Sequence, residues 1–221
     1  EALLRWHHPS MGIIDPDDFI PIAEKDDTIV SLGTFVMEGA MAQLAEWQKK
    51  YRNPDLFMCI NVTSAQVFQE GYFNLLQKTC ARSKILPDKI VLEFSEIGFS
   101  EIYKWNSSIL GEMKNAGFHI ALDDYGEGRA SIRSLVDYQM DFLKIDRSLS
   151  LEALSDDRKR RLFELMIHLG HESNFQIVVE GIQTPEILKY VIGSKAQMGQ
   201  GYLFSRPCPP QQIEELLKKQ A

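Results

Sequence analysis

Apolar and polar residues divide the chain into two kinds of segment, and their order predicts an α/β protein. Short apolar runs flanked by turn-forming residues are typical of buried strands, and apolar residues spaced three or four apart are typical of helices. The runs that predict strands are residues 2–6, 56–60, 90–92, 119–122, 142–146, 176–179 and, as a shorter candidate, 196–200.

Helical spacing fills the intervals between these runs. We expect a short helix capped by Asp17, a long helix spanning Leu32 to Trp47, and helices capped by Ser64 and Ser100. The other predicted helices are 72–81, a short one starting at Ser131, one running to His171 with Ser155 as its cap, one opened by Pro185, and 211–219.

The alternation of strand and helix with short links predicts a parallel sheet covered on both faces. We interpret the whole chain, 1–221, as one domain with a modified TIM-type (β/α)8 barrel that apparently lacks its first strand, so that the domain is incomplete at its N-terminal end. An open, doubly wound sheet is the structural alternative. In a barrel of this type, functional groups lie at the C-terminal ends of the strands.

Composition and charge narrow the functional classes. The chain is 44% apolar and 25% charged, which is ordinary for a globular domain. Its formal net charge of −7 argues against a general DNA- or RNA-binding protein. We find no run of about 18 apolar residues and expect no membrane span. Cys59, Cys80 and Cys208 form no disulfide or zinc pattern, which favours a reducing, cytoplasmic location.

Candidate chemistry lies where the predicted strands end. Most of these ends carry a carboxylate or an amide, and Asp123 and Asp124 are adjacent before a glycine-containing loop. The strand-end residues are Asn61, Glu93, Asp123, Asp124, Lys144, Asp146, Glu180 and Gln200, and Glu1 flanks the first run. Oxygen donors without His or Cys favour Mg²⁺ or Mn²⁺ over zinc.

The number of candidate ligands favours two ions that share Asp123. The predicted metal ligands are Glu1, Asn61, Glu93, Asp123, Asp124 and Glu180. Paired ions of this kind clamp the attacking and leaving oxygens of a phosphoester. Lys144 is then expected to position the attacking water or offset phosphate charge, and Glu180 to hold a metal or accept the proton of the water.

The motifs around these residues resemble the EAL domain family, bacterial phosphodiesterases that open cyclic di-GMP to linear pGpG. The resemblance covers essentially the whole chain, in order. The motifs are EALLRW at 1–6, FIPIAE at 19–24, INVT at 60–63, EFSE at 93–96, LDDYG at 122–126, LKID at 143–146, VEG at 179–181 and QGY at 200–202.

The resemblance implies a barrel with a two-metal site, inhibited by Ca²⁺, in which Lys144 and Glu180 are catalytic. Glu1, Asn61, Glu93 and Asp123 would hold one ion, and Asp123, Asp124 and Glu180 the other. The substrate-binding residues that it implies are Leu3, Arg5, Asp146, Gln183, Gln200 and Tyr202. Glu96 would support the loop after Asp124, through which a homodimer would form.

The chain departs from the family pattern in three places. Gln183 stands where a second Glu usually follows the VEG motif, and Glu127 and Arg129 alter the loop after the aspartate pair. The family's first strand, with its Gln-Pro-Ile stretch, is not in this sequence. Upstream sensor or diguanylate cyclase domains are common in relatives, and a membrane anchor there would make this the cytoplasmic part of a larger protein.

Three functions remain open. The first is a metal-dependent cyclic di-GMP phosphodiesterase. The second is a catalytically weak or inactive EAL domain that binds cyclic di-GMP as a receptor, which the change at Gln183 and the altered loop keep open. The third is another metal-assisted barrel enzyme, such as an enolate-forming one, which Arg5 and the adjacent aspartates fit less well.

Overall fold

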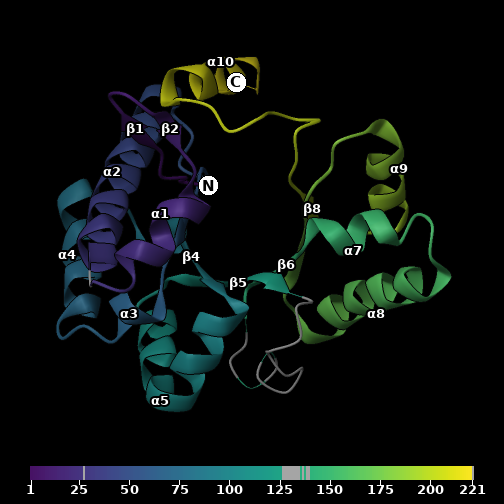
Figure 1. The fold of residues 1–221 in the computed structure, drawn as a ribbon, viewed down its shortest axis with the longest axis horizontal. Helices are drawn as coiled ribbons and strands as arrows, with labels where there is room; N and C mark the ends of the chain where they lie inside the picture. Colours follow the sequence, from purple (N-terminus) through teal and green to yellow (C-terminus); the bar gives the residue numbers. More distant parts are fainter. Residues whose placement is uncertain (27, 126–134, 136, 138–139, 221) are drawn as a thin grey trace. The chain divides into compact units, whose positions relative to one another are not determined.

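The computed structural model describes the chain except residues 27, 126–134, 136, 138–139 and 221 (Figure 1). The chain forms two compact units. Unit 1 comprises Glu1–Leu92, Gly111–Phe118 and Pro209–Ala221, and unit 2 comprises Glu93–Leu110 and His119–Cys208. Strand β4, Ile90–Ser95, carries the chain from unit 1 into unit 2.

Unit 1 is mainly helical. A hairpin of β1 (Trp6–His8) and β2 (Gly12–Ile14) precedes helices α1 (Pro16–Ala23) and α2 (Thr28–Tyr51). The following elements are β3 (Met58–Asn61), α3 (Ser64–Val67), α4 (Tyr72–Ser83), the short 3₁₀ helix η1 (Pro87–Lys89), the start of β4 and, at the end of the chain, α10 (Pro210–Gln220).

Unit 2 contains most of the parallel sheet. Its elements are the end of β4, most of α5 (Glu96–Asn115), β5 (His119–Tyr125), β6 (Phe142–Ile145), α7 (Arg147–Glu152), α8 (Asp157–Ser173), β7 (Gln176–Val179), α9 (Pro185–Gly193) and β8 (Met198–Gly199). The sheet order is β3-β4-β5-β6-β7-β8, and the pairs from β5 to β8 are parallel. Helix α8 packs against β7 and α7, and Figure 1 shows these elements within unit 2.

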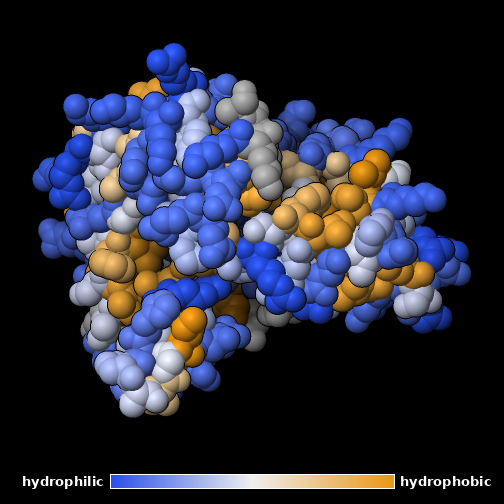
Figure 2. Space-filling view, turned by 90° about the horizontal axis from the view of Figure 1, so that it is seen from above, coloured by the Kyte–Doolittle hydropathy of each residue, from blue (hydrophilic) through white to orange (hydrophobic). Residues whose placement is uncertain are grey.

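The strands of unit 2 are apolar because both of their faces are covered. Ile120, Leu122, Leu143, Ile177 and Val179 are buried in them, as expected for parallel strands that have helices between them. The strand runs predicted at 119–122, 142–146 and 176–179 are therefore confirmed in type and position. On the outside, polar side chains cover most of the face drawn in Figure 2, with smaller apolar areas between them.

Helix α2 is the one described helix that is long and apolar enough, by length and composition alone, to cross a membrane. It packs against α3, α4 and β3 in unit 1. Met37, Ala40, Met41 and Leu44 on its inner face are buried. We therefore assign α2 to the core of unit 1.

The predicted strand at residues 2–6 is wrong in extent. Ala2 makes only an isolated parallel bridge to Ile60, with its N–H 2.9 Å from the Cys59 carbonyl. The extended residues begin at Trp6 and pair antiparallel with β2. Gly12 adopts φ = 77°, which lets the chain reverse there, so a local hairpin forms in place of a longer sheet strand.

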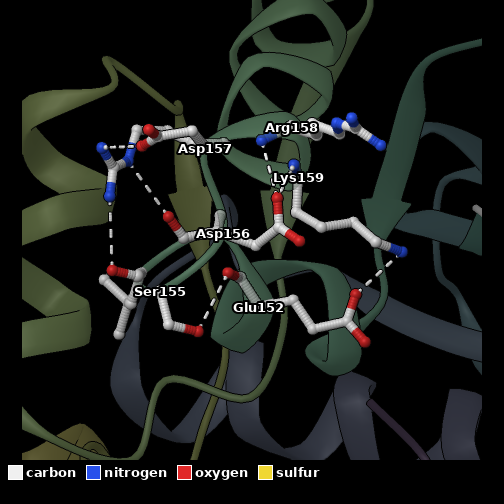
Figure 3. Close-up of polar contacts among 9 residues, drawn as sticks. Glu152, Ser155, Asp156, Asp157, Arg158 and Lys159 are labelled. Atoms are coloured by element: carbon white, nitrogen blue, oxygen red, sulfur yellow. Dashed lines mark hydrogen bonds and ion pairs between the residues drawn. The ribbon is translucent and has the colours of Figure 1, made fainter.

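Several predicted helix starts are displaced. Helix α8 is capped by Asp156 rather than Ser155, and Figure 3 shows the Asp156 carboxylate directed at the N–H groups of Arg158 and Lys159. Asp15 caps α1, and Thr63 caps α3. Each true cap is an Asp or Thr next to the predicted region, because several adjacent residues have side-chain oxygens suited to the role.

Helix α5 begins at Glu96, four residues before the predicted cap Ser100, which lies inside the helix and donates to the Glu96 carbonyl. The helix is interrupted at Asn106, whose φ of −152° and ψ of 53° are not helical. The short helix α7 was not predicted, and the helix predicted to start at Ser131 begins outside the described residues.

Candidate active site

The C-terminal ends of the parallel strands in unit 2 bring four predicted site residues together. Leu122 pairs with Leu143, and Ile145 pairs with Val179, so β5, β6 and β7 end at nearly the same level. Lys144 then projects from β6, one residue before the strand ends, and Glu180 follows the last residue of β7.

Lys144 lies at the centre of this group. Its Nζ is 2.9 Å from Glu180 Oε1, 3.0 Å from Asp123 Oδ2 and 3.3 Å from Glu93 Oε1. The Lys144 side chain is only 3% exposed and that of Glu93 only 2%. The ion pairs are therefore shielded from water, where they act more strongly than surface pairs.

The backbone at Asp124 explains how two adjacent aspartates reach one site. Neighbouring strand residues normally point to opposite faces. Asp124 instead adopts a left-handed φ of 53°, and the β5–β6 register shifts between Leu122 and Tyr125. The Asp124 N–H donates to Asp123 Oδ1 at 2.9 Å. This local turn lets Asp123 and Asp124 both face the carboxylate of Glu180.

Carboxylate oxygens of Asp123, Asp124 and Glu180 lie within 4.8 Å of one another. Among the described residues, this group contains four carboxylates, those three and Glu93, and one ammonium group, which together carry a charge of about −3 if all are ionised. Such an excess is unfavourable in a partly buried site unless a cation balances it. The donor set consists of hard oxygens, so these residues fit Mg²⁺ or Mn²⁺.

Glu1 and Asn61, the predicted ligands in unit 1, lie together there. The Asn61 side-chain amide donates to Glu1 Oε1 at 2.9 Å. Both residues are exposed. Asn61 is the last residue of β3, as the sequence predicted for a strand-end group.

The predicted substrate-binding residues occupy varied positions. In unit 1, Leu3 is 42% exposed, and the Arg5 Nη1 donates to the Leu4 carbonyl at 2.7 Å. In unit 2, Asp146 caps α7 by accepting from the Ser148 N–H at 2.8 Å. A capping role therefore accounts for Asp146 whether or not it also contacts a ligand.

The remaining substrate-binding candidates follow β7 and β8. The Gln200 N–H donates to the Val179 carbonyl at 2.8 Å, which places Gln200 beside the end of β7. Gln183 is partly buried in the segment after Glu180. Tyr202 is 49% exposed, and the Arg206 guanidinium carbon lies 4.7 Å from the centre of its ring.

Glu96 is buried at the start of α5 in unit 2. Burial, and secondarily the negative charge of Glu96, raise the pKa of Tyr125 above its ordinary value. Tyr125 is the last residue of β5, and the loop that Glu96 was predicted to support begins at the next residue, outside the described part of the chain. The support of that loop by Glu96 stays a prediction.

Comparison with known proteins identifies the family. The family model described as "EAL domain" matches residues 1–207. The chain belongs to the EAL domain family. This confirms the resemblance that the motifs indicated.

Two curated relatives and one solved structure illustrate the similarity. The chain is 30% identical over 219 residues to the cyclic di-GMP phosphodiesterase PA2567 of Pseudomonas aeruginosa, covering 99% of the chain and 37% of that protein. It is 32% identical over 209 residues to an uncharacterized signaling protein of Caulobacter vibrioides, covering 95% of the chain and 25% of the relative. The chain therefore spans well under half the length of these relatives.

The solved structure is the PaMucR phosphodiesterase in complex with c-di-GMP. It matches with a TM-score of 0.88 at 29% identity, covering 96% of this chain and 85% of that one. The match confirms the predicted class, an α/β fold of the barrel-like EAL type with a mostly parallel sheet.

Sequence reasoning underestimated Lys144. Its position at a strand end pointed to a role toward water or phosphate, but its contacts with three carboxylates were not predicted. The contacts span 21, 36 and 51 residues of sequence and depend on strand register. The available signal was a lysine inside the otherwise apolar strand Phe142–Ile145.

Proposed function

We propose that this EAL domain is a metal-dependent phosphodiesterase that hydrolyses cyclic di-GMP to linear pGpG. The observation that carries the proposal is the cluster at the strand ends of unit 2, where Glu93, Asp123 and Glu180 surround Lys144 and Asp124 lies beside them. An arrangement of this kind is unfavourable for stability and is well suited to bind divalent cations.

We assign the roles from the contacts. Asp123, Asp124 and Glu180 would hold a divalent ion, and bound ions of this type polarise a phosphoryl oxygen and acidify a water. Glu180 would also accept the proton of the attacking water. Lys144, already hydrogen-bonded to Asp123, would orient that water or offset the charge that develops on the phosphate.

The family resemblance, rather than geometry, assigns the other roles. Glu1, Asn61, Glu93 and Asp123 would hold a second ion. Leu3, Arg5, Asp146, Gln183, Gln200 and Tyr202 would bind the nucleotide, with Arg5 on a phosphate and Tyr202 near a guanine. Glu96 would support the loop after Asp124, and a homodimer would form through that loop.

Hydrolysis of cyclic di-GMP by the full-length protein with Mn²⁺ tests the proposal. We expect pGpG as the product, and at least a 100-fold lower rate for Glu180→Gln, which keeps the side-chain shape but removes the charge. Substitution of Ca²⁺ for Mn²⁺ should inhibit turnover. Absence of pGpG from the wild-type protein under Mg²⁺ and Mn²⁺ would exclude the enzyme.

A receptor function is the second candidate, and Gln183 in place of the usual Glu favours it. An amide at this position lacks the charge that a glutamate would supply. Calorimetry with cyclic di-GMP in Ca²⁺, followed by product analysis in Mg²⁺, separates the two functions. Tight binding without product identifies a receptor, and product formation identifies the enzyme.

We place the domain in the cytoplasm, on its own or as the cytoplasmic part of a larger, membrane-anchored signalling protein with sensor or diguanylate cyclase domains. Cys59, Cys80 and Cys208 are free thiols, in keeping with a reducing compartment. We expect no DNA partner, given the net charge of −7.

A further inference from the structure

We propose that Ser150 positions Glu180 for metal binding and proton transfer. The inference rests on the role proposed above for Glu180 and adds a residue that does not touch the metal or the substrate. Ser150 lies in α7, 30 residues before Glu180, and its fully buried hydroxyl contacts the Glu180 main chain.

Helix α7 lies directly on the peptide that follows Glu180. Gly181 adopts a left-handed φ of 71°. A Cβ atom built at Gly181 would lie 2.3 Å from Arg147 Cγ and 2.6 Å from Arg147 Cβ. These separations are far below van der Waals contact, so only glycine permits the first turn of α7 to approach this closely.

The Ser150 hydroxyl supplies the polar part of this contact. Ser150 Oγ is 3.1 Å from the Glu180 carbonyl and 2.9 Å from the Arg147 carbonyl. One hydroxyl carries one proton, so the two carbonyls share it. In helical geometry the Arg147 carbonyl also accepts from the N–H of Leu151, so the contribution specific to Ser150 is the bond to Glu180.

The two amide groups of Glu180 are thereby tied to different elements. Its N–H donates to the carbonyl of Ile145, the last residue of β6, at 3.1 Å. Its carbonyl accepts from Ser150, on the helix that follows β6. The orientation of both peptides sets the direction of the side chain, whose Oε1 lies 2.9 Å from Lys144 Nζ.

Removal of the hydroxyl should therefore disturb the Glu180 carboxylate without altering any atom of the site. For Ser150→Ala we expect Mn²⁺ affinity to fall about 3- to 10-fold, the range of a lost buried hydrogen bond. We expect kcat for cyclic di-GMP to fall by a similar factor, with KM within about twofold of wild type, because Glu180 acts on the water and not on the nucleotide.

Ser194→Ala is the matched control. Ser194 follows α9 in the same unit, and its hydroxyl donates to the Val191 carbonyl three residues earlier at 2.7 Å, as Ser150 does to Arg147. It therefore reports the loss of a local serine bond alone. We expect Mn²⁺ affinity and kcat of this variant to stay within about twofold of wild type.

A double-mutant cycle tests whether Ser150 affects Mn²⁺ binding through Glu180. Mn²⁺ binding by calorimetry is compared for wild type, Ser150→Ala, Glu180→Gln and the double variant. If Ser150 acts through Glu180, Ser150→Ala has little further effect once Glu180 is replaced. Gly181→Ala, which pushes Arg147 away from the same peptide, should reproduce the loss of Mn²⁺ affinity.

The outcomes separate this inference from the proposed function. Weaker Mn²⁺ binding by Ser150→Ala supports the positioning role even if the wild-type protein produces no pGpG, which contradicts only the phosphodiesterase. A variant that melts at a lower temperature but binds Mn²⁺ as Ser194→Ala does would overturn the role of Ser150. The role of Ser150 would also be overturned if Ser150→Ala weakened Mn²⁺ binding equally in the wild-type protein and in the Glu180→Gln variant.

Discussion

The two ends of the parallel strands in unit 2 carry polar groups that are arranged in opposite ways. At the N-terminal end, the Asp141 carboxylate accepts from the Ile120 N–H at 2.8 Å and lies 3.1 Å from His119 Nδ1. At the C-terminal end, carboxylates outnumber the single ammonium group of Lys144. Among the described residues, the charges at the N-terminal end are matched by neighbouring groups, whereas the printed ion pairs at the C-terminal end join three carboxylates to one ammonium group.

A second group at the N-terminal end shows the same matching. The ring of His171 lies between the Lys195 carbonyl, 3.1 Å from Nε2, and the Gln197 side-chain nitrogen, 3.2 Å from Nδ1. The Gln197 side-chain oxygen, Oε1, accepts from the Ile177 N–H at 3.0 Å. Polar side chains at the N-terminal end accept hydrogen bonds from backbone N–H groups near the start of the strands. The carboxylates at the C-terminal end are arranged so that they can bind a cation.

The largest expected effect comes from removing the ammonium group of Lys144. Lys144→Met leaves buried carboxylates without their ammonium partner, so the free energy of unfolding without metal should fall by about 3–5 kcal/mol. Added Mn²⁺ should restore part of the loss, because a bound ion stabilises the folded state. Thermal unfolding with and without Mn²⁺ measures both effects, and Lys189→Met, at an exposed lysine of α9, is the control. A loss no greater than that of the control would contradict the comparison.

The next effect concerns a carboxylate in excess. Asp124→Asn should lower turnover of cyclic di-GMP about 10- to 100-fold through weaker metal binding. The melting temperature without metal should stay equal or rise, since one repulsive charge is removed and asparagine accepts the left-handed φ of 53° well. Steady-state kinetics and thermal unfolding on the same sample check the pair of results. A clear loss of stability would show that Asp124 is structural.

At the N-terminal ends of the strands, we expect a substitution to lower stability and to leave turnover nearly unchanged. Asp141→Ala removes the side-chain acceptor of the Ile120 N–H, at a residue that is itself buried, and should lower the free energy of unfolding by about 1–3 kcal/mol. Turnover at saturating substrate should remain within about twofold of wild type. Urea unfolding and steady-state kinetics test this prediction. A loss of rate comparable with that of Asp124→Asn would contradict the assignment of a structural role to the N-terminal ends of the strands.

The smallest effect is expected at Gln197. Gln197→Ala removes the acceptor of the Ile177 N–H and the contact with His171, and should cost about 0.5–1.5 kcal/mol. His171→Ala should cost less, because the ring is exposed. Urea unfolding of both single variants and the double variant measures their coupling. Strict additivity would mean that the His171–Gln197 contact contributes nothing.

Much of the fold was predictable because its signals are local. The apolar runs of β5, β6 and β7 predicted buried strands in the right places, and α2, α4 and α10 followed their helical spacing. Errors gathered where several residues compete for one role, as at the caps Asp15, Thr63 and Asp156. The hairpin at Trp6 was missed because a short apolar run does not indicate its partner.

The sequence alone determined which groups stand at the strand ends and that their oxygens suit hard divalent ions. The tertiary structure decided that Lys144 contacts three of those acids, that Asp124 turns toward Asp123, and that Ser150 reaches Glu180. The physical reason is the range of each effect. Burial patterns and capping act over a few residues, whereas these contacts join separate strands and helices and exist only once the sheet has its register.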